Sequence, residues 1–208
     1  IRQRLVNEGS IFQSSNDTEV IIHLIARSVR ATLVERVVDA LSQLEGAYSL
    51  VALSRKKLIG VRDPLGVRPL AVGRIKGEDG KNAYTLASES CAFDILGAEF
   101  VRELDPGEMV IIDDEQITYT KPFPTMKPRP CTFEHIYFAR PDSTIGGRYV
   151  YESRKRIGQE LARESHPQGG VDIIVPVPDS GVPAAIGYAQ ESSAPYELGI
   201  IRSPYYAR

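Results

Sequence analysis

Two segments of the chain carry side chains that could bind charged ligands. In the first, SSNDTE (Ser14 to Glu19), Asp17 stands before an apolar run, where a fixed carboxylate could bind an ammonium group. An acid is equally expected at a positive helix start, so spacing alone leaves both interpretations open. In the second, VDIIVPVPDSG, an apolar strand leads into Asp179, Ser180 and Gly181. Backbone amides of such a loop could bind phosphate at a helix N-terminus, although many loops share this pattern.

Two further strings carry charged residues in turns. RDPLGVRPL combines a strand end with a proline and a glycine, and Arg62, Asp63 and Arg68 can pair with one another or with carbonyls. This is typical of a tight structural loop. In ASESCAFD, Ser88 and Glu89 are expected to end a strand and cap a helix.

The remaining candidates for metal or redox chemistry are scattered. Cys91 and Cys131 show no CxxC spacing, and His23, His135 and His166 show no HxxxH spacing. Each is expected to be an ordinary packed or polar residue.

Composition excludes several classes of partner. The 25 basic and 27 acidic residues are mixed along the chain, so no basic face predicts nucleic-acid or membrane binding. No apolar run approaches the about 20 residues that span a bilayer. A cytoplasmic protein is expected.

The first half of the chain predicts helices followed by strands. Asn16 and Glu19 have capping-box spacing, and Thr32 and Glu35 repeat it before a second helix whose apolar face ends near Gly46. Short runs between turn residues predict strands over 48–53, 58–62, 70–74, 84–87, 109–112 and 117–120. A largely antiparallel sheet with helices is an α+β arrangement.

The second half has a different pattern. Four prolines within 121–131 disfavour helix and strand and predict an interdomain linker. Beyond it we expect a helix over 149–164, a strand over 171–177, a turn over 178–181, a helix to about 191 and a strand over 198–201, which is a parallel βαβ unit. The expected domains are therefore 1–120 and 132–208.

In this order, SSNDTE, RDPLGVRPL, ASESCAFD, FEHIYFARPDS (Phe133 to Ser143) and VDIIVPVPDSG resemble the amidophosphoribosyltransferases, glutamine-dependent enzymes of purine synthesis. The resemblance covers essentially the whole chain. It implies a fold of the α+β / α/β class, in which an N-terminal nucleophile (Ntn) glutaminase, an αββα sandwich, occupies 1–120. The start of a type I phosphoribosyltransferase α/β domain would occupy 132–208.

The resemblance also implies a reaction. The family hydrolyses glutamine through a cysteinyl thioester, and the ammonia passes through a channel to displace pyrophosphate from phosphoribosyl pyrophosphate. Mg²⁺ neutralises the leaving group, and the product is 5-phosphoribosylamine. Purine nucleotides are the expected inhibitors, and a homo-oligomer is the expected assembly.

Residue roles follow from the matching motifs. Asp17 corresponds to the aspartate that binds the α-amino group of glutamine, and Tyr151 to a position near the ammonia path. Cys131 corresponds to one of four [4Fe-4S] ligands in those members that carry a cluster. The residues expected to line the phosphoribosyl pyrophosphate pocket are Asp179, Ser180, Gly181 and Arg202. Those expected to form scaffold around the glutamine site are Arg62, Asp63, Arg68, Ser88 and Glu89.

The chain also departs from the family pattern. The family nucleophile is an N-terminal cysteine whose own amine acts as base, and neither Ile1 nor the internal Cys91 and Cys131 can replace it, so no catalytic residue is expected here. The Asn-Gly pair of the oxyanion hole and the VDDS phosphoribosyl loop are also missing. We expect an internal fragment of the enzyme, inactive and poorly stable by itself.

Two alternatives remain open. Another class II amidotransferase, such as asparagine synthetase or the hexosamine-forming enzyme, would share the glutaminase motifs but is disfavoured by YFARPDS and IVPVPDSG. A non-catalytic ligand-binding module of the same fold would agree with the missing nucleophile.

Overall fold

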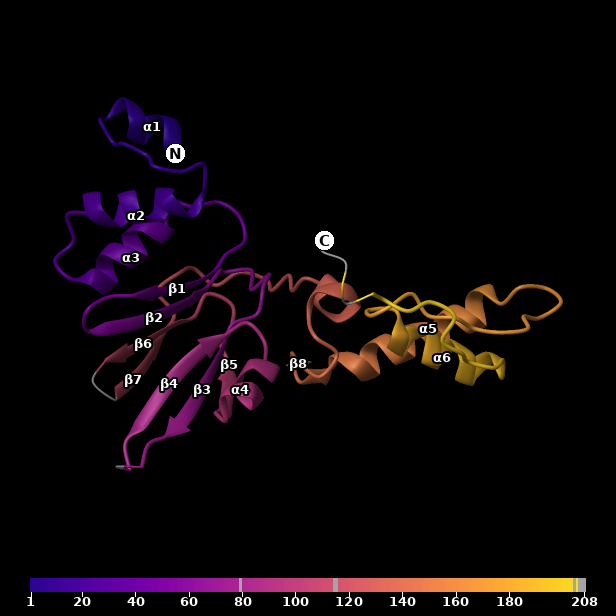
Figure 1. Cartoon of the computed structure of the whole chain (residues 1–208). Helices are drawn as coiled ribbons and strands as arrows, with labels where there is room; N and C mark the ends of the chain where they lie inside the picture. The colour runs from indigo at the N-terminus through magenta and orange to yellow at the C-terminus, as the bar shows by residue number, and fades with distance from the viewer. Residues whose placement is uncertain (79, 114–115, 204, 206–208) are drawn as a thin grey trace.

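The computed structural model describes residues 1–78, 80–113, 116–203 and 205 (Figure 1). Residues 204 and 206–208 of the expected C-terminal domain therefore lie outside the described residues. The helices are α1 (Arg2–Asn7), α2 (Thr18–Arg27), α3 (Leu33–Leu41), α4 (Cys91–Leu96), η1 (Glu134–Phe138), α5 (Val150–Ser165) and α6 (Val182–Ser192). The strands are β1 (Ser49–Leu53), β2 (Lys57–Arg62), β3 (Ala71–Lys76), β4 (Asn82–Ala87), β5 (Glu99–Glu103), β6 (Met109–Asp113), β7 (Gln116–Thr120), β8 (Thr144–Ile145) and β9 (Arg148–Tyr149).

Only one of the two expected capping boxes forms. At α3 the Thr32 hydroxyl accepts from the Glu35 amide, and the Glu35 carboxylate accepts from the Thr32 amide at 2.9 Å. The expected box of Asn16 with Glu19 is wrong, because the Glu19 carboxylate accepts from amides of the preceding loop instead. The helix α3 ends at Leu41, earlier than expected.

Two antiparallel sheets form the centre of the N-terminal part, with strand orders β1-β2-β6-β7 and β4-β3-β5. Six of these strands agree with the expected runs to within a few residues. The strand β5 was missed, because its sequence EFVRE begins and ends with glutamate, and it lies at a sheet edge.

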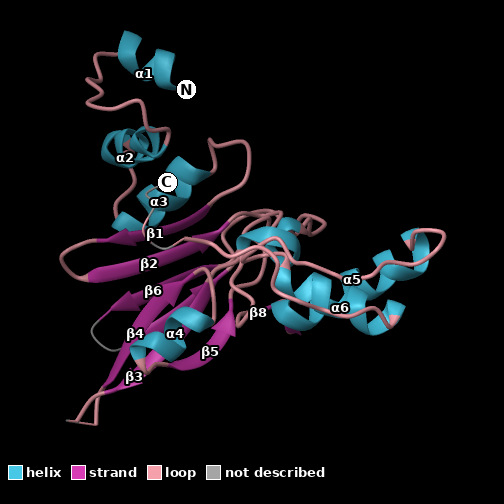
Figure 2. Ribbon diagram, turned by 45° about the vertical axis from the view of Figure 1, so that its right-hand side comes forward, coloured by secondary structure: helices cyan, strands magenta, loops and turns pink. Residues whose placement is uncertain are grey.

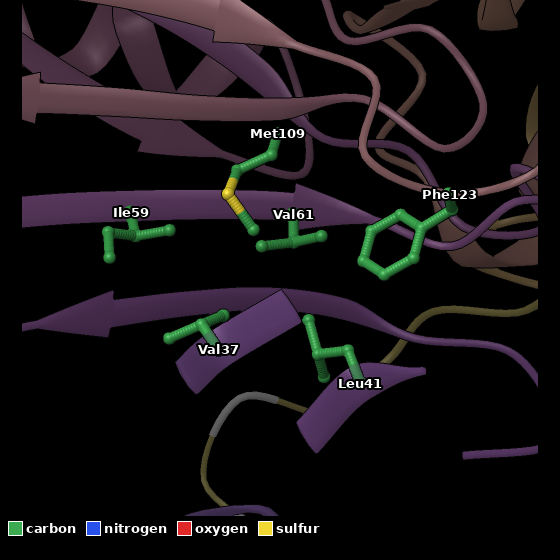
Figure 3. Close-up of a cluster of buried hydrophobic side chains, with 6 residues drawn as sticks. All are labelled: Val37, Leu41, Ile59, Val61, Met109 and Phe123. Carbon is green, nitrogen blue, oxygen red and sulfur yellow. The ribbon is translucent and has the colours of Figure 1, made fainter. Parts of the chain in front are cut away.

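These elements stack in the layer order helix, sheet, sheet, helix (Figures 1 and 2). The helices α2 and α3 cover the first sheet, and their contact contains a cluster of buried side chains: Val37, Leu41, Ile59, Val61, Met109 and Phe123 (Figure 3). Between the sheets lie Leu70, Val72, Leu104 and Val110. On the far face α4 sets Phe93 against Gly73, where an added Cβ would lie 2.4 Å from the ring. This confirms the expected α+β class and its antiparallel sheets.

The C-terminal part consists mainly of the helix pair α5 and α6 (Figure 1). Glycines allow the two backbones to approach: a Cβ at Gly158 would lie 1.9 Å from the Ala184 carbonyl oxygen, and one at Gly187 equally close to the Lys155 oxygen. Both helices and the turn over 178–181 agree with expectation.

The two strands expected around α6 are wrong. Within the described residues, 171–177 takes part in one isolated parallel bridge, between Ile174 and Tyr196, and 198–201 contains no strand or bridge. Pro176 and Pro178 have no N–H to donate, and a parallel pair without neighbouring strands is weak. The crossover is parallel as expected, but no sheet forms.

The proline-rich passage 121–131 contains no helix or strand, as expected. It is nevertheless fixed to the turn of RDPLGVRPL, because the Arg129 amide donates to the Leu65 carbonyl and the Cys131 amide to the Val67 carbonyl. Of the helices in the described part of the chain, none is long and apolar enough to cross a membrane.

Candidate functional site

A pocket of about 420 Å³ lies where α2 meets the start of β1, and we call it the Asp17 pocket. Its walls combine apolar residues of α2 and β1 with the acids Asp17 and Glu45 and the phenol of Tyr48. The full lining is Ile1, Asp17, Thr18, Val20, Ile21, Leu44, Glu45, Ala47, Tyr48, Ser49 and Leu50. Two carboxylates and no cationic side chain suit a ligand with an ammonium group.

Asp17 is the N-cap residue of α2, but its side chain makes no cap hydrogen bond. Its exposed carboxylate has no hydrogen bond or ion pair with any described residue, so it is available to a ligand. The loop before it is held by Glu19, which accepts from the Gln13 amide at 2.7 Å and the Ser14 amide at 2.9 Å. These hydrogen bonds lower the Glu19 pKa to about 2. Arg2 donates to two carbonyls of the same loop.

Tyr48 forms the link between this pocket and the RDPLGVRPL turn. Burial, with a smaller contribution from Asp63, raises its pKa to about 12, so the phenol stays protonated and can donate at neutral pH. Its carbonyl accepts from the Asp63 amide at 3.0 Å. The fully buried Asp63 carboxylate accepts from the amides of Leu65 and Val67.

The two arginines of this turn are both engaged. Arg62 donates to the carbonyls of Arg68, Leu104 and Gly66, at 2.9, 2.6 and 2.9 Å. Arg68 instead forms an ion pair with Glu134 in η1 and lies over the ring of Phe138. Within the part of the chain that the structure describes, neither they nor Asp63 line the Asp17 pocket.

Ser88 and Glu89 do not cap α4 as expected, because its N-cap is Ser90. The Glu89 carboxylate accepts from the Arg140 amide at 2.7 Å and from the Ser143 hydroxyl at 2.9 Å. Glu89 thus fixes the ARPDS loop to the N-terminal part. The exposed Ser88 side chain bonds to no described residue.

A second pocket of about 420 Å³, the Arg202 pocket, lies between η1 and the start of α6. It brings together three of the expected phosphate-side residues, Asp179, Ser180 and Arg202, with the aromatic end of η1. The lining is Tyr137, Phe138, Ala139, Arg140, Pro141, Arg154, Pro178, Asp179, Ser180 and Arg202. Three arginines against one aspartate suit an anionic ligand.

The charges of the Arg202 pocket are partly paired. Arg202 contacts Asp179 at 3.1 Å, and Arg140 is bidentate to Asp142. Arg154 is buried and donates to carbonyls of η1 and of the residue that follows it. Gly181 does not line this pocket; it is the N-cap of α6, and its amide donates to the Val177 carbonyl.

Tyr151 and Cys131 lie outside both pockets. Tyr151 is in the first turn of α5, and its amide donates to the Pro141 carbonyl. Cys131 lines a different pocket, beside Glu134 and His135. The described residues contain no group of three His, Cys, Asp or Glu side chains that could hold a metal ion, so by themselves they do not fit an iron-sulfur cluster.

Sequence reasoning missed three buried charges, Glu108, Glu134 and Arg154. Glu134 is the first residue of η1 and Arg154 donates to a carbonyl of it, and no periodicity in the sequence predicts this single turn of π-helix. In the string EHIYF one acid precedes the apolar side chains of Ile136, Tyr137 and Phe138, which the structure leaves exposed. Only the fold explains why the Glu134 side chain is buried.

The comparisons with known proteins agree with this geometry. Residues 1–94 match the family model described as a glutamine amidotransferase domain. The chain is 48% identical over 213 residues to the amidophosphoribosyltransferase of Rhizobium etli and 45% identical over 208 residues to that of Bacillus subtilis. Each alignment covers 100% of this chain and 42% of the relative. The chain thus spans about two-fifths of the length of the curated relatives it matches.

Solved structures give the same result. The chain is similar to the glutamine phosphoribosylpyrophosphate (PRPP) amidotransferase from B. subtilis complexed with ADP and GMP, with a TM-score of 0.92 and 45% identity over 100% of this chain and 44% of that one. A structure described as the allosteric regulatory enzyme of purine biosynthesis also has a TM-score of 0.92. These matches confirm the resemblance read from the motifs. The match of residues 1–94 to a glutamine amidotransferase domain agrees with the α+β fold and the antiparallel sheets of the N-terminal part.

Proposed function

Because the chain is a homologue of the amidophosphoribosyltransferases along its whole length, we propose that it belongs to an enzyme that converts phosphoribosyl pyrophosphate to 5-phosphoribosylamine with glutamine. The chain would contribute the glutamine-binding scaffold and the start of the phosphoribosyl-binding part. The observation that carries the proposal is that two pockets of opposite charge lie on one chain whose motifs match this family.

Glutamine would bind in the Asp17 pocket. The uncommitted Asp17 carboxylate would accept from the α-ammonium group, and the protonated Tyr48 phenol is a further donor on the same wall. Neither Cys91 nor Cys131 lines this pocket. The described residues therefore bind and orient glutamine, and the attacking thiolate is not one of their side chains.

Phosphoribosyl pyrophosphate would bind in the Arg202 pocket. Arg202 would exchange its contact with Asp179 for a phosphate, while Ser180 and the amides before α6 add donors. Mg²⁺ usually takes one or two carboxylates together with substrate phosphates, and Asp179 is the carboxylate available for it. When bound, the ion would neutralise the pyrophosphate leaving group.

Other features of the enzyme are proposed on the resemblance alone. These are the domain division at the 121–131 linker, Tyr151 near the ammonia path, Cys131 as a cluster ligand in the presence of further ligands, a homo-oligomer, and a cytoplasmic location. Inhibition by purine nucleotides has one additional support, since the similar B. subtilis enzyme is described as complexed with ADP and GMP.

The test is a product assay on the complete gene product that contains this chain. With glutamine, phosphoribosyl pyrophosphate and Mg²⁺ we expect glutamate and phosphoribosylamine in equal amounts. Arg202→Gln should raise the KM for phosphoribosyl pyrophosphate about tenfold or more, by the loss of a charge-assisted contact. Arg55→Gln, an exposed arginine in the β1–β2 turn, is the matched control and should change nothing. Absence of phosphoribosylamine from the unmodified protein would contradict the proposal.

A further inference from the structure

The contact between Arg68 and Glu134 joins the RDPLGVRPL turn to η1, segments that lie more than sixty residues apart in the sequence. Arg68 Nε lies 2.7 Å from Glu134 Oε1, and its guanidinium lies 4.5 Å from the centre of the Phe138 ring. The Glu134 side chain is 5% exposed. Its Oε1 has no partner with hydrogen-bond geometry among the described residues, so charge rather than a directed hydrogen bond holds it.

A chain of hydrogen-bonded residues connects the Asp17 pocket to the contact between Arg68 and Glu134. Tyr48 lines that pocket, and its carbonyl holds the Asp63 amide. The Asp63 carboxylate fixes the Val67 amide at 3.1 Å, and the Val67 carbonyl in turn accepts from the Cys131 amide at 2.9 Å. Arg68 follows Val67 directly, so the turn that supports Tyr48 also sets the base of the Arg68 side chain.

On the η1 side, the contact between Arg68 and Glu134 adjoins the Arg202 pocket through Phe138. Phe138, against which Arg68 stacks, lines that pocket beside Tyr137. Glu134 starts η1 and Phe138 ends it. Burial raises the Glu134 pKa, and Arg68 opposes this, so separation of the pair would leave a poorly solvated carboxylate. A shift of η1 therefore has to break the ion pair.

We propose that Arg68 and Glu134 are positioning residues that hold the aromatic wall of the Arg202 pocket, which η1 forms, in register with the Asp17 pocket. The pair touches neither substrate. The pair would affect the transfer of ammonia between the two reactions. With the pair intact, ammonia released at the Asp17 pocket is used at the Arg202 pocket. This inference rests on the proposed function.

The chain contains a matched control pair. Arg102 and Glu108 form an ion pair at 2.8 Å with a Glu108 side chain that is 7% exposed, and Arg102 lies 4.7 Å from the centre of the Tyr119 ring. The burial of the glutamate, the distance between the charged groups and the stacking of the arginine on a ring thus resemble those of the pair Arg68 and Glu134. Both control residues, however, lie within the glutaminase part and touch neither pocket.

The test compares Glu134→Gln with Glu108→Gln in the complete gene product. Glutamate and phosphoribosylamine are measured in one reaction at saturating glutamine and phosphoribosyl pyrophosphate, and phosphoribosylamine is measured again with ammonium chloride as the nitrogen source. For Glu134→Gln we expect glutamate to exceed phosphoribosylamine about threefold to tenfold, from a coupling energy of the usual size for such networks. The ammonia-dependent rate should stay near that of the unmodified enzyme.

Other outcomes would overturn the inference. A Glu134→Gln product ratio near one contradicts it, and so does an equal shift in Glu108→Gln, since loss of any buried ion pair would then suffice. If Glu134→Gln fails to fold, the test uses Arg68→Lys, which keeps the charge and removes the planar stacking group. The ratio of glutamate to phosphoribosylamine is then measured in the same way and decides the outcome. An unmodified protein that makes no phosphoribosylamine refutes the proposed function instead, so the two failures are distinguishable.

Discussion

The N-terminal and C-terminal parts of the chain bury their apolar side chains to very different extents. Antiparallel strands joined by short turns complete two sheets, and helices cover both outer faces. Among the described residues beyond the linker, the buried cluster comprises Ala139, Ile145 and Val150, while apolar side chains of the last segments remain exposed, among them Val177, Leu198 and Ile201. An antiparallel sheet is completed by local hairpins, whereas a parallel one needs strands distant in sequence and covered faces.

The largest expected effect tests this difference directly. Leu41 is 2% exposed in the core under α3, and Leu198 is 63% exposed. Leu41→Ala should lower the free energy of unfolding by about 2–5 kcal/mol through lost burial and a cavity. Leu198→Ala, the matched control, should change it by less than about 0.5 kcal/mol. Urea unfolding measures both, and equal losses would contradict the comparison.

A smaller effect is expected where α5 and α6 touch. In Gly158→Val the new Cβ would meet the Ala184 carbonyl oxygen, and the helix pair should lose about 1–3 kcal/mol of stability. Hydrogen exchange should show faster α6 amides, while those of β2 and β6 stay protected. Arg156→Val, on the exposed side of α5, is the control. Faster exchange in both parts would mean that they unfold as one unit.

The capping box of α3 should contribute less. Thr32→Ala removes the hydroxyl that accepts from the Glu35 amide and should cost about 1 kcal/mol. Thr18→Ala changes a threonine in the first turn of α2 whose hydroxyl bonds to no described residue. Thermal unfolding should separate the two variants, and indistinguishable melting temperatures would show that this cap does not stabilise the N-terminal part.

The smallest effect concerns the loop before Asp17. Hydrogen bonds from Gln13 and Ser14 lower the Glu19 pKa from 4.5 to about 2, so the ionised form is favoured in the fold. The stabilisation is fully present above pH 4.5 and is lost as the pH falls through about 2. Protection of the Ser14 amide, its exchange rate relative to the intrinsic rate at the same pH, should fall over this range, and Glu19→Gln should lack this protection throughout. Glu164→Gln, an exposed acid of α5, should leave the profile unchanged; a pH-independent protection of Ser14 would contradict the assignment.

The sequence predicted elements well where the pattern is local. The Thr32 capping box, six strands and the helices α5 and α6 depend on neighbours in the chain. The capping box predicted at Asn16 does not form, because the Glu19 carboxylate accepts from the Gln13 amide in the folded loop. The strand over 171–177 failed because its apolar run indicates burial but supplies no partner strand.

The candidate site follows the same rule. Asp17 and the group of Asp179, Ser180 and Arg202 could be chosen from motifs, and each set lines a pocket. Glu134 and the actual contacts of Glu89 could not, because their partners lie far away in sequence. Long-range ion pairs leave no periodic signal.

The most direct test of the central claim is calorimetric titration of glutamine into the complete gene product. The account predicts binding that Asp17→Asn weakens about tenfold or more, through the loss of a charge-assisted contact to the ammonium group. Asp94→Asn, an exposed acid in the first turn of α4, should bind like the unmodified protein. Equal affinity in all three proteins, or no binding by the unmodified one, would contradict the assignment of the Asp17 pocket as the glutamine site.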